Sequence, residues 1–434
     1  MSIFVSALKA NGAEEDPVSK QQAIEGLAYA TLQPRVKELV ARDSTLLQCI
    51  VKLLSEAPPS KAAVAYGALS IFANLTRYSP VLTEEQLKMH QLKAYANASR
   101  EPAVAEQEES LLQSRVYVDE RCSLAFDAGI VPVLVTQTAK AGSPASVALA
   151  VAIVYSISMS PHLGGPLSQQ GAVGMLINAW SALPDSDKPS RRTAAQALAR
   201  ILIRINPALA LGGNRPTALA SAVRPLASIL TPDADSEVRD MLPSFEALMA
   251  LTNLASTEDA ATRRLIVSIA WPHAEELMLH SNPRVARAAV ELVCNLVQFP
   301  EGIALYAEGS AKAKSRIHIM LALASAEDGG TCSAAGGALA SLTLHEAIVE
   351  AICNREGGVG MALGLCRDRN DDIRHRGVVV VDNMALTTGT VGKTARASLR
   401  DAGAIDVLNE CARTSGRQEV VAGALRALRN LGDS

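Results

Sequence analysis

Hydrophobic positions recur along this chain in an eight-residue phrase that begins with a small residue and ends in Asn-Leu or a close relative. Five clear copies span Ala68–Leu75, Ala247–Leu254, Ala289–Leu296, Gly377–Met384 and Ala424–Leu431, and their asparagines are Asn74, Asn253, Asn295, Asn383 and Asn430. Degenerate copies place Tyr29, Ser156, Ile201 and Ser341 at the asparagine position. Successive copies lie 42 to 52 residues apart, except for one interval of 82 that contains a long insertion. A period in the forties is typical of armadillo or HEAT repeats.

A second recurring phrase places a glycine before two apolar residues. It occurs at Asp127-Ala128-Gly129-Ile130-Val131, at Gln170-Gly171-Ala172-Val173, at Glu356-Gly357-Gly358-Val359 and at Asp401-Ala402-Gly403-Ala404-Ile405. Glycine adopts the left-handed conformation without the strain that a Cβ causes, so we expect it to end a first helix and let a second begin at a sharp angle. A longer third helix then carries the asparagine. This order of three helices is that of an armadillo repeat rather than a HEAT repeat.

The chain is therefore predicted to be all-α, an armadillo-type right-handed superhelical solenoid of about eight three-helix repeats. The repeats fall at about residues 34–76, 117–158, 161–204, 206–255, 257–298, 300–343, 345–386 and 392–431. A single third helix over residues 18–31 precedes them. Because the repeat phase resumes after every irregular segment, we expect residues 1–434 to form one continuous solenoid domain.

Three segments interrupt the repeat. Residues 77–116 form an insertion, in which a charged helix over Thr83–Ala98 is followed by a polar, acidic stretch over Ser99–Ser114. That stretch has few apolar residues to bury, so we expect a mobile loop that a protease cuts first. Residues 205–221 and 231–243 are rich in Pro, Gly and Asp and are predicted to be surface loops.

Composition supports the helical prediction and excludes several classes of function. Apolar residues make up 49% of the chain but aromatic residues only 3%, so the core must consist mainly of Ala, Leu, Val and Ile, which suit closely packed helices. The formal net charge is −3 and no long block of like charge occurs, so we expect neither nucleic acid nor a membrane as a partner. The seven cysteines are scattered without a CxxC pair, and no signal peptide is recognisable, which indicates a reducing, cytoplasmic location.

No motif in the sequence predicts catalysis, a metal site or a cofactor. Gly392-Lys393-Thr394 resembles the end of a phosphate-binding loop, but Thr387 replaces the earlier glycine of that motif and no strand precedes it, so we interpret it as a loop between helices. His345-Glu346 begins like a zinc-protease helix, but Val349 occupies the position of the second histidine. We therefore expect a non-enzymatic protein without catalytic residues, metal ligands or a cofactor.

Two groups of arginines on predicted third helices admit two interpretations. Arg192, Arg200 and Arg204 lie on neighbouring turns, and Arg374-His375-Arg376 opens a later third helix. Nucleic-acid binding would need interleaved aromatic residues and a net positive charge, and both are missing. A solvated helix face is the simpler interpretation. The second is a basic patch within a protein-binding groove, and it makes Arg374 and Arg376 candidate site residues.

The five asparagines are the most suggestive candidates for a binding site. In a solenoid, third helices line the concave face, and one position per repeat forms a ladder along it. An asparagine amide has two donors and an acceptor, so each rung can hydrogen-bond the main chain of an extended bound segment. The alternative is that each asparagine only holds its own repeat together by bonding a helix terminus. The sequence leaves both interpretations open.

Four stretches are more specific than a general armadillo repeat: Ala23–Tyr29, Ala194–Ala199 with Asn206-Pro207, Ser244–Ala255 and Ile373–Val380. In this order they resemble the UCS family of myosin chaperones, over nearly the whole chain. The insertion at 77–116 also falls where that family has a long helix and a mobile loop. The resemblance implies a UCS domain that binds the myosin motor domain and promotes its folding, stability or actin-dependent function, without hydrolysing nucleotide itself.

The resemblance also bears on partners. Some family members carry an N-terminal tetratricopeptide domain that recruits Hsp90. This sequence contains no such domain and lacks the central region that precedes the UCS domain, so we expect an excised domain or a truncated member, with Hsp90 binding left open.

The alternative function is a general armadillo adaptor that captures an extended peptide in its concave groove, in the manner of β-catenin or importin-α. Importin-like binding predicts tryptophans beside the asparagines. Trp180 and Trp271 instead fall at positions that belong to second helices.

Overall fold

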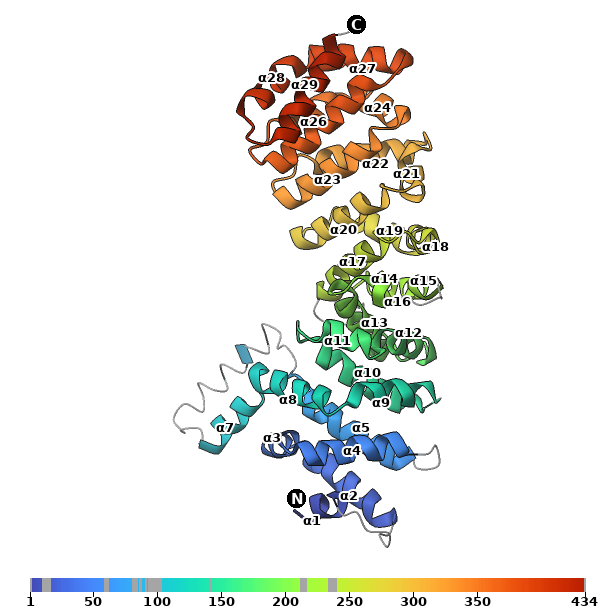
Figure 1. Ribbon diagram of the computed structural model, residues 1–434, viewed down its shortest axis with the longest axis vertical. Coiled ribbons are helices and arrows are strands. Elements are labelled where there is room, and N and C mark those ends of the chain that lie inside the picture. The colour runs from blue at the N-terminus through green and yellow to red at the C-terminus, as the bar shows by residue number, and fades with distance from the viewer. Residues whose placement is uncertain are drawn as a thin grey trace. The chain divides into compact units, whose positions relative to one another are not determined.

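Every regular element in the described part of the chain is a helix (Figure 1). The computed structural model describes residues 2–9, 17–57, 62–79, 85, 88–89, 92, 104–140, 142–210, 217–232 and 240–432. Contacts within the chain divide it into two compact units, Met1–Glu246 and Ala247–Ser434. The all-α prediction is confirmed, whereas a single domain over residues 1–434 stays a prediction.

The N-terminal unit begins with two helices and continues in three-helix repeats. The leading helices are α1 (Ser2–Lys9) and α2 (Pro17–Ala30), and α2 is the predicted single third helix. Three repeats follow: α3 (Pro34–Arg42), α4 (Ser44–Glu56) and α5 (Ala62–Thr76); α8 (Arg115–Asp127), α9 (Ile130–Ala139) and α10 (Pro144–Ser158); and α11 (Gly164–Gln169), α12 (Ala172–Ala182) and α13 (Lys188–Ile203). The fourth repeat contains the short helices α14 (Pro207–Ala210), α15 (Thr217–Ser221) and α16 (Val223–Ser228), and ends in α17 (Leu242–Ala255), whose last turns belong to the second unit.

The C-terminal unit contains four further repeats. The first consists of α18 (Ala260–Leu265), the π-helical η2 (Ile266–Ala270), α19 (Trp271–Leu277) and the third helix α20 (Pro283–Leu296). The others are α21 (Pro300–Ala307), α22 (Ala311–Leu323) and α23 (Gly329–Leu342); α24 (Glu346–Cys353), α25 (Gly358–Cys366) and α26 (Asp371–Leu386); and α27 (Gly389–Asp401), α28 (Ala404–Thr414) and α29 (Gln418–Gly432). The predicted three-helix repeats are therefore confirmed, and both tryptophans lie on second helices.

The recurring glycine phrase ends first helices as its sequence predicts. The glycine before each second helix has φ between 71° and 88° at the four predicted positions, Gly129, Gly171, Gly357 and Gly403. A Cβ added to Gly129 or Gly403 would meet no atom within 4 Å, so the backbone conformation, rather than lack of space, requires glycine. Gly309, with φ 73°, occupies the corresponding connection before α22, where the full phrase is missing from the sequence.

Third helices begin at a side-chain cap and then bury most of their surface. The first turns of α13, α20, α23 and α26 are capped by the side chains of Asp187, Asn282, Asp328 and Asn370. Buried residues on α20 recur at spacings of three and four, at Val285, Ala288, Ala289, Leu292, Val293 and Leu296. In the C-terminal unit, α20, α23, α26 and α29 pack successively side by side (Figure 1). We call the surface of these four helices, together with the end of α17, the third-helix face.

Two predictions about irregular segments need correction. The predicted surface loop over residues 205–221 contains the short helices α14 and α15. Within the predicted loop over Ser99–Ser114, Val104–Leu112 forms helix α7, because Leu112 is buried and Glu108 pairs with Arg35 of α3 at 2.6 Å. The mobility of the insertion stays a prediction.

Other predicted segments lie mostly outside the described residues. Of the predicted helix over Thr83–Ala98, only residues 85, 88, 89 and 92 are described, and they are helical. Residues 99–103 of the acidic stretch and 233–239 of the last predicted loop also lie outside the described residues.

No single helix in the described ranges is long and apolar enough to cross a membrane. Two bent helix pairs, α8 with α9 and α20 with α21, reach the required length and apolar composition only when each pair is taken together.

Candidate functional site

The candidate asparagines Asn74, Asn295, Asn383 and Asn430 hydrogen-bond the preceding third helix. The Nδ2 atoms of Asn74, Asn295, Asn383 and Asn430 lie 2.8 to 3.2 Å from their acceptors. In the same order, the acceptors are the carbonyl oxygens of Ala28, Thr252 and Ala340 and a carboxylate oxygen of Asp382. Each acceptor residue comes directly before the position that aligns with the asparagine in the previous repeat. The fifth candidate, Asn253, lies half-buried on α17.

These bonds give the recurring asparagine a structural role. Asn74 and Asn383 donate a second bond, to the hydroxyl groups of Thr31 and Thr343 at 3.1 and 3.2 Å. A half-buried carbonyl needs a partner, and the asparagine of the next repeat supplies one. The alternative prediction, that each asparagine bonds a helix terminus of its own repeat, is therefore wrong for these four residues. Their hydrogen bonds join two neighbouring repeats. Contact between these side chains and a bound segment stays a prediction.

A hollow of about 580 Å³ opens in the third-helix face of the C-terminal unit. We call it the third-helix hollow. It is lined by Thr252, Arg287, Glu291, Cys294, Asn295, Gly329, Gly330, Ser333, Ala334, Asn370, Asp372 and Arg376. It brings together two of the candidate residues, Asn295 and Arg376. The other candidates, Asn74, Asn253, Asn383, Asn430 and Arg374, do not line it.

Two arginines lie against α23 in the third-helix hollow because α23 carries glycines there. A Cβ added to Gly330 would overlap the guanidinium of Arg287, and one added to Gly337 would overlap that of Arg376. Arg376 also contacts the thiol of Cys294 on α20. Burial raises the pKa of this thiol, and the nearby guanidinium partly offsets the effect.

The remaining candidate arginines are engaged within the fold. Arg374 donates through Nε and Nη2 to the Asp368 carbonyl at 3.0 and 2.8 Å, and pairs through Nη1 with Asp371 at 3.0 Å. Arg200 is 5% exposed and pairs through Nε with a carboxylate oxygen of Glu246 at 2.8 Å. A solvated helix face is therefore the wrong interpretation for Arg200.

Several arginines cap the carboxyl ends of third helices, a role that sequence reasoning missed. Arg121 of α8 is 1% exposed and donates through Nε to the Leu75 carbonyl at 2.9 Å. Arg396 of α27 donates to the Ala385 carbonyl at 2.9 Å. Arg204 donates to the carbonyl at the end of α10, that of Ser158, at 2.8 Å. A cation at this end satisfies open carbonyl groups and opposes the helix dipole.

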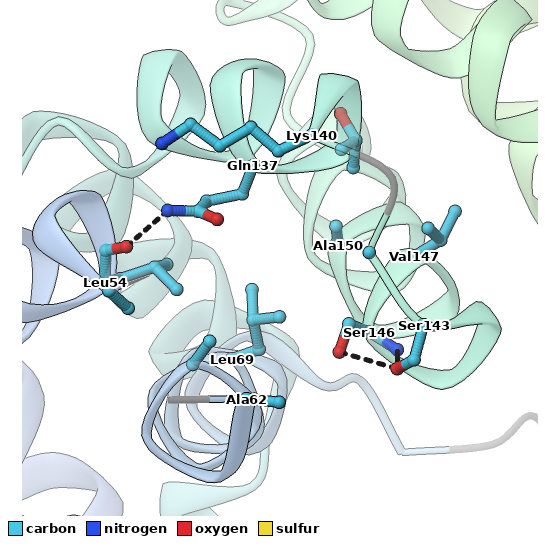
Figure 2. Close-up of a pocket in the computed structure, with 13 residues that line it drawn as sticks. Leu54, Ala62, Leu69, Gln137, Lys140, Ser143, Ser146, Val147 and Ala150 are labelled. Atoms are coloured by element: carbon cyan, nitrogen blue, oxygen red, sulfur yellow. Dashed lines mark hydrogen bonds between the residues drawn. The ribbon is translucent and has the colours of Figure 1, made fainter. Parts of the chain in front are cut away.

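A smaller pocket of about 140 Å³ lies in the N-terminal unit, between α4, α5, α9 and α10 (Figure 2). Its walls are largely apolar, with Leu54, Leu69 and Val147 among them. At its edge, Gln137 donates through Nε2 to the Leu54 carbonyl at 2.5 Å. None of the candidate site residues lines this pocket, and its polar groups suggest no reaction.

The motif that resembles a phosphate-binding loop lies inside a helix. Gly392-Lys393-Thr394 occupies the first turns of α27, so its interpretation as a connecting loop is wrong. A Cβ at Gly392 would overlap the Thr387 carbonyl, because the backbone packs closely at the turn into α27. Close packing therefore explains why this position is glycine. The Thr394 hydroxyl donates to the Thr390 carbonyl at 3.1 Å. Among the described residues, no group of three or more His, Cys, Asp or Glu side chains is placed to hold a metal ion.

Comparison with protein-family models gives no match. Against curated proteins, the chain is 30% identical to Ring assembly protein 3 of Schizosaccharomyces pombe over 372 residues, which cover 84% of this chain and 47% of that protein. It is 27% identical to Protein unc-45 homolog B of Homo sapiens over 387 residues, which cover 87% of this chain and 39% of that protein. The chain thus spans about half, or less, of the length of these relatives.

Solved structures with the same fold include UNC-45 from Drosophila melanogaster, with a TM-score of 0.80 at 24% identity over 99% of this chain and 51% of that one. The myosin chaperone UNC-45 from C. elegans, in complex with an Hsp90 peptide, gives a TM-score of 0.80 at 20% identity over 98% of this chain and 43% of that one. She4p gives a TM-score of 0.75 at 20% identity over 99% of this chain and 56% of that one. These likenesses confirm the armadillo-like helical solenoid. With its sequence relatives, its fold neighbours and the stretches Ser244–Ala255 and Ile373–Val380 in agreement, the chain belongs to the UCS-domain family.

Proposed function

We propose that this chain is a myosin-directed chaperone domain, which binds the myosin motor domain and promotes its folding, stability or actin-dependent function. The observation that carries the proposal is the similarity to Ring assembly protein 3 and unc-45 homolog B, which extends over 84% and 87% of the chain. One solved structure of the same fold is described as the myosin chaperone UNC-45, and another as an UNC-45 chaperone studied for binding and folding muscle myosin.

The third-helix face is the surface best suited to hold such a client. It carries an open, polar hollow of about 580 Å³, whereas the first helices α8 and α27 use Arg121 and Arg396 to cap the repeat before them. Repeat proteins commonly bind partners along a surface that successive repeats build together. Candidate residues Asn295 and Arg376 lie in this hollow, so they are the first to examine for client contact.

The proposed mechanism is binding, without a catalytic step or nucleotide hydrolysis. A chaperone that binds a partly folded client lowers the concentration of the free form that aggregates. Protection of the client from aggregation should therefore depend on the molar ratio of chain to client and need no ATP.

A cytoplasmic location belongs to the same proposal. Structures of C. elegans UNC-45 contain a bound Hsp90 peptide or a bound Hsp70 peptide. Binding of Hsp90 by this chain is a separate question, and the proposed chaperone function does not depend on it.

The test uses a recombinant myosin motor domain heated to a temperature at which it aggregates. We expect the chain to suppress light scattering in proportion to its molar ratio, and to co-elute with the motor domain in gel filtration. Citrate synthase is the control client, and its aggregation should continue unchanged. A general armadillo adaptor would bind extended peptides without protecting the motor domain. Absence of both co-elution and protection would overturn the proposed function.

A further inference from the structure

The third-helix hollow is lined by two arginines, Arg287 and Arg376, and two carboxylates, Glu291 and Asp372. Glu291 pairs with Arg287 at 2.8 Å, and Asp372 pairs with Arg417. Arg376 forms no ion pair with any of the residues that the structure describes. Arg376 is therefore the one charged side chain of the hollow's lining that no carboxylate in the described part of the chain pairs with.

The position of this guanidinium depends on a single glycine. Arg376 projects from α26, lies over Gly337 of α23, and reaches the thiol of Cys294 on α20. A Cβ at Gly337 would overlap Nη1 of Arg376 and lie 3.0 Å from the Cys294 Sγ atom. Because residue 337 has no side chain, Arg376 can extend from α26 across α23 to α20.

We propose that the third-helix hollow binds an extended client segment through a carboxylate side chain, which pairs with Arg376. The inference rests on the proposed function for the identity of the client, while the chemistry follows from the hollow. A neutral segment laid over Arg376 would strip water from a charge and give it no partner, which is costly. An Asp or Glu side chain removes that cost, because a guanidinium can hold both carboxylate oxygens.

The spacing of the helices suits an extended segment. Neighbouring helices pack about 8–10 Å apart, so α20 and α26, on either side of α23, are separated by about 16–20 Å. An extended chain rises about 3.3 Å per residue, so about six residues cross the three helices. Asn295 and Ser333 lie within the same hollow and can hydrogen-bond the main chain of such a segment.

The test measures binding of overlapping 15-residue peptides that cover the myosin motor domain, by fluorescence anisotropy. We expect the peptides that bind to contain Asp or Glu. Changing that residue to Asn or Gln should weaken binding to the unmodified chain about tenfold or more. The Arg376→Ala variant should bind the acidic and the amide peptide equally weakly. Arg284→Ala, which removes an exposed arginine of α20 outside the hollow, is the matched control and should bind as the unmodified chain does.

A second variant separates recognition from folding. Gly337→Ala leaves every charge in place but displaces the Arg376 guanidinium. Alanine favours a helix interior over glycine, so the variant should remain folded and helical by circular dichroism. We expect it to weaken binding of the acidic peptide about as much as Arg376→Ala does. The double variant should then show little further loss, since both changes remove one interaction.

The outcomes distinguish this inference from the proposed function. If the motor domain does not bind at all, the proposed function is overturned. If the motor domain binds, but no peptide does, or the peptides that bind need no carboxylate, only the present inference fails. It also fails if folded Gly337→Ala and Arg376→Ala variants bind the acidic peptide as tightly as the unmodified chain.

Discussion

At the scale of single residues, the recurring asparagines join neighbouring third helices in the structure. Asn383 shows the arrangement most fully, because its amide donates to the Ala340 carbonyl at 2.8 Å and to the Thr343 hydroxyl at 3.2 Å. We expect Asn383→Ala to lower the free energy of unfolding by about 0.5–1.5 kcal/mol, the usual net contribution of a hydrogen bond. Urea denaturation followed by circular dichroism measures this change.

Asn383→Asp is the matched variant, since it keeps the shape of the side chain and replaces the donor by an acceptor. It places an oxygen opposite the Ala340 carbonyl, so we expect it to cost at least as much stability as alanine does. If Asn383→Ala left stability unchanged and weakened binding of the motor domain, the asparagine would serve the client rather than the repeat.

Sequence reasoning could find these asparagines but not their partners. Recurrence at one position per repeat indicates that Asn74 and Asn383 have a role. It does not indicate which neighbouring group their amides hydrogen-bond. The arginine caps were missed for a related reason. Arg121 and Arg396 serve the same purpose, but the insertion at 77–116 and the variable connections place them at different distances from the preceding asparagine. No fixed spacing therefore marks them.

At the scale of helices, glycine has two opposite effects in this fold. Gly403 adopts φ 79° before α28, whereas Gly364 lies exposed inside α25 without a positive φ. We expect Gly403→Ala to lower the free energy of unfolding by about 1–2 kcal/mol, because alanine strains the left-handed conformation. Gly364→Ala should instead raise it by up to about 1 kcal/mol through helix propensity. No atom lies within 4 Å of either added Cβ, so thermal denaturation of the two variants compares backbone effects alone. Equal effects of the same sign would contradict this explanation.

The cap of α23 gives stability a dependence on pH. The hydroxyl and main-chain N–H of Thr331 donate to Asp328 at 2.7 Å and lower the pKa of its carboxyl group. A lowered folded-state pKa means that the cap contributes fully above the unfolded-state pKa of about 3.9, and that the contribution is lost as pH falls through the folded-state value. We expect Asp328→Ala to be less stable than the unmodified chain by about 1 kcal/mol at pH 7.

Urea denaturation between pH 7 and pH 3 checks this dependence. The stability difference between the unmodified chain and Asp328→Ala should narrow at the acid end of the range. Asp328→Asn keeps an acceptor without a titratable group, so it should lose less stability than alanine at pH 7. A difference between the unmodified chain and Asp328→Ala that stays constant over the whole range would rule out the charged cap.

Helix boundaries were predicted well where a local signal exists. The glycines at 129, 171, 357 and 403 set the turns because their backbone conformation is intrinsic to the residue. Helix α7 was missed because its composition is mostly polar. Its anchoring residue, Leu112, becomes buried only when α7 packs against α3 and α8.

At the scale of the molecule, repeat period and resemblance were enough to predict the three-helix repeats and the family. The third-helix hollow was not predictable, because Arg287, Gly337 and Arg376 come from three repeats and no local pattern relates them. Their meeting depends on how far each third helix is shifted along its neighbour. Of the candidate residues, Asn295 and Arg376 line that hollow, and contact of any candidate with a client stays a prediction.

The central claim is that the third-helix face holds a myosin motor domain. Hydrogen–deuterium exchange of the chain, followed by mass spectrometry with and without a saturating motor domain, tests it most directly. We predict slower exchange in the first turns of α20, α23 and α26, with exchange of the first helices α21 and α24 unchanged. Unchanged exchange in α20, α23 and α26, or slower exchange confined to α21 and α24, would contradict the claim.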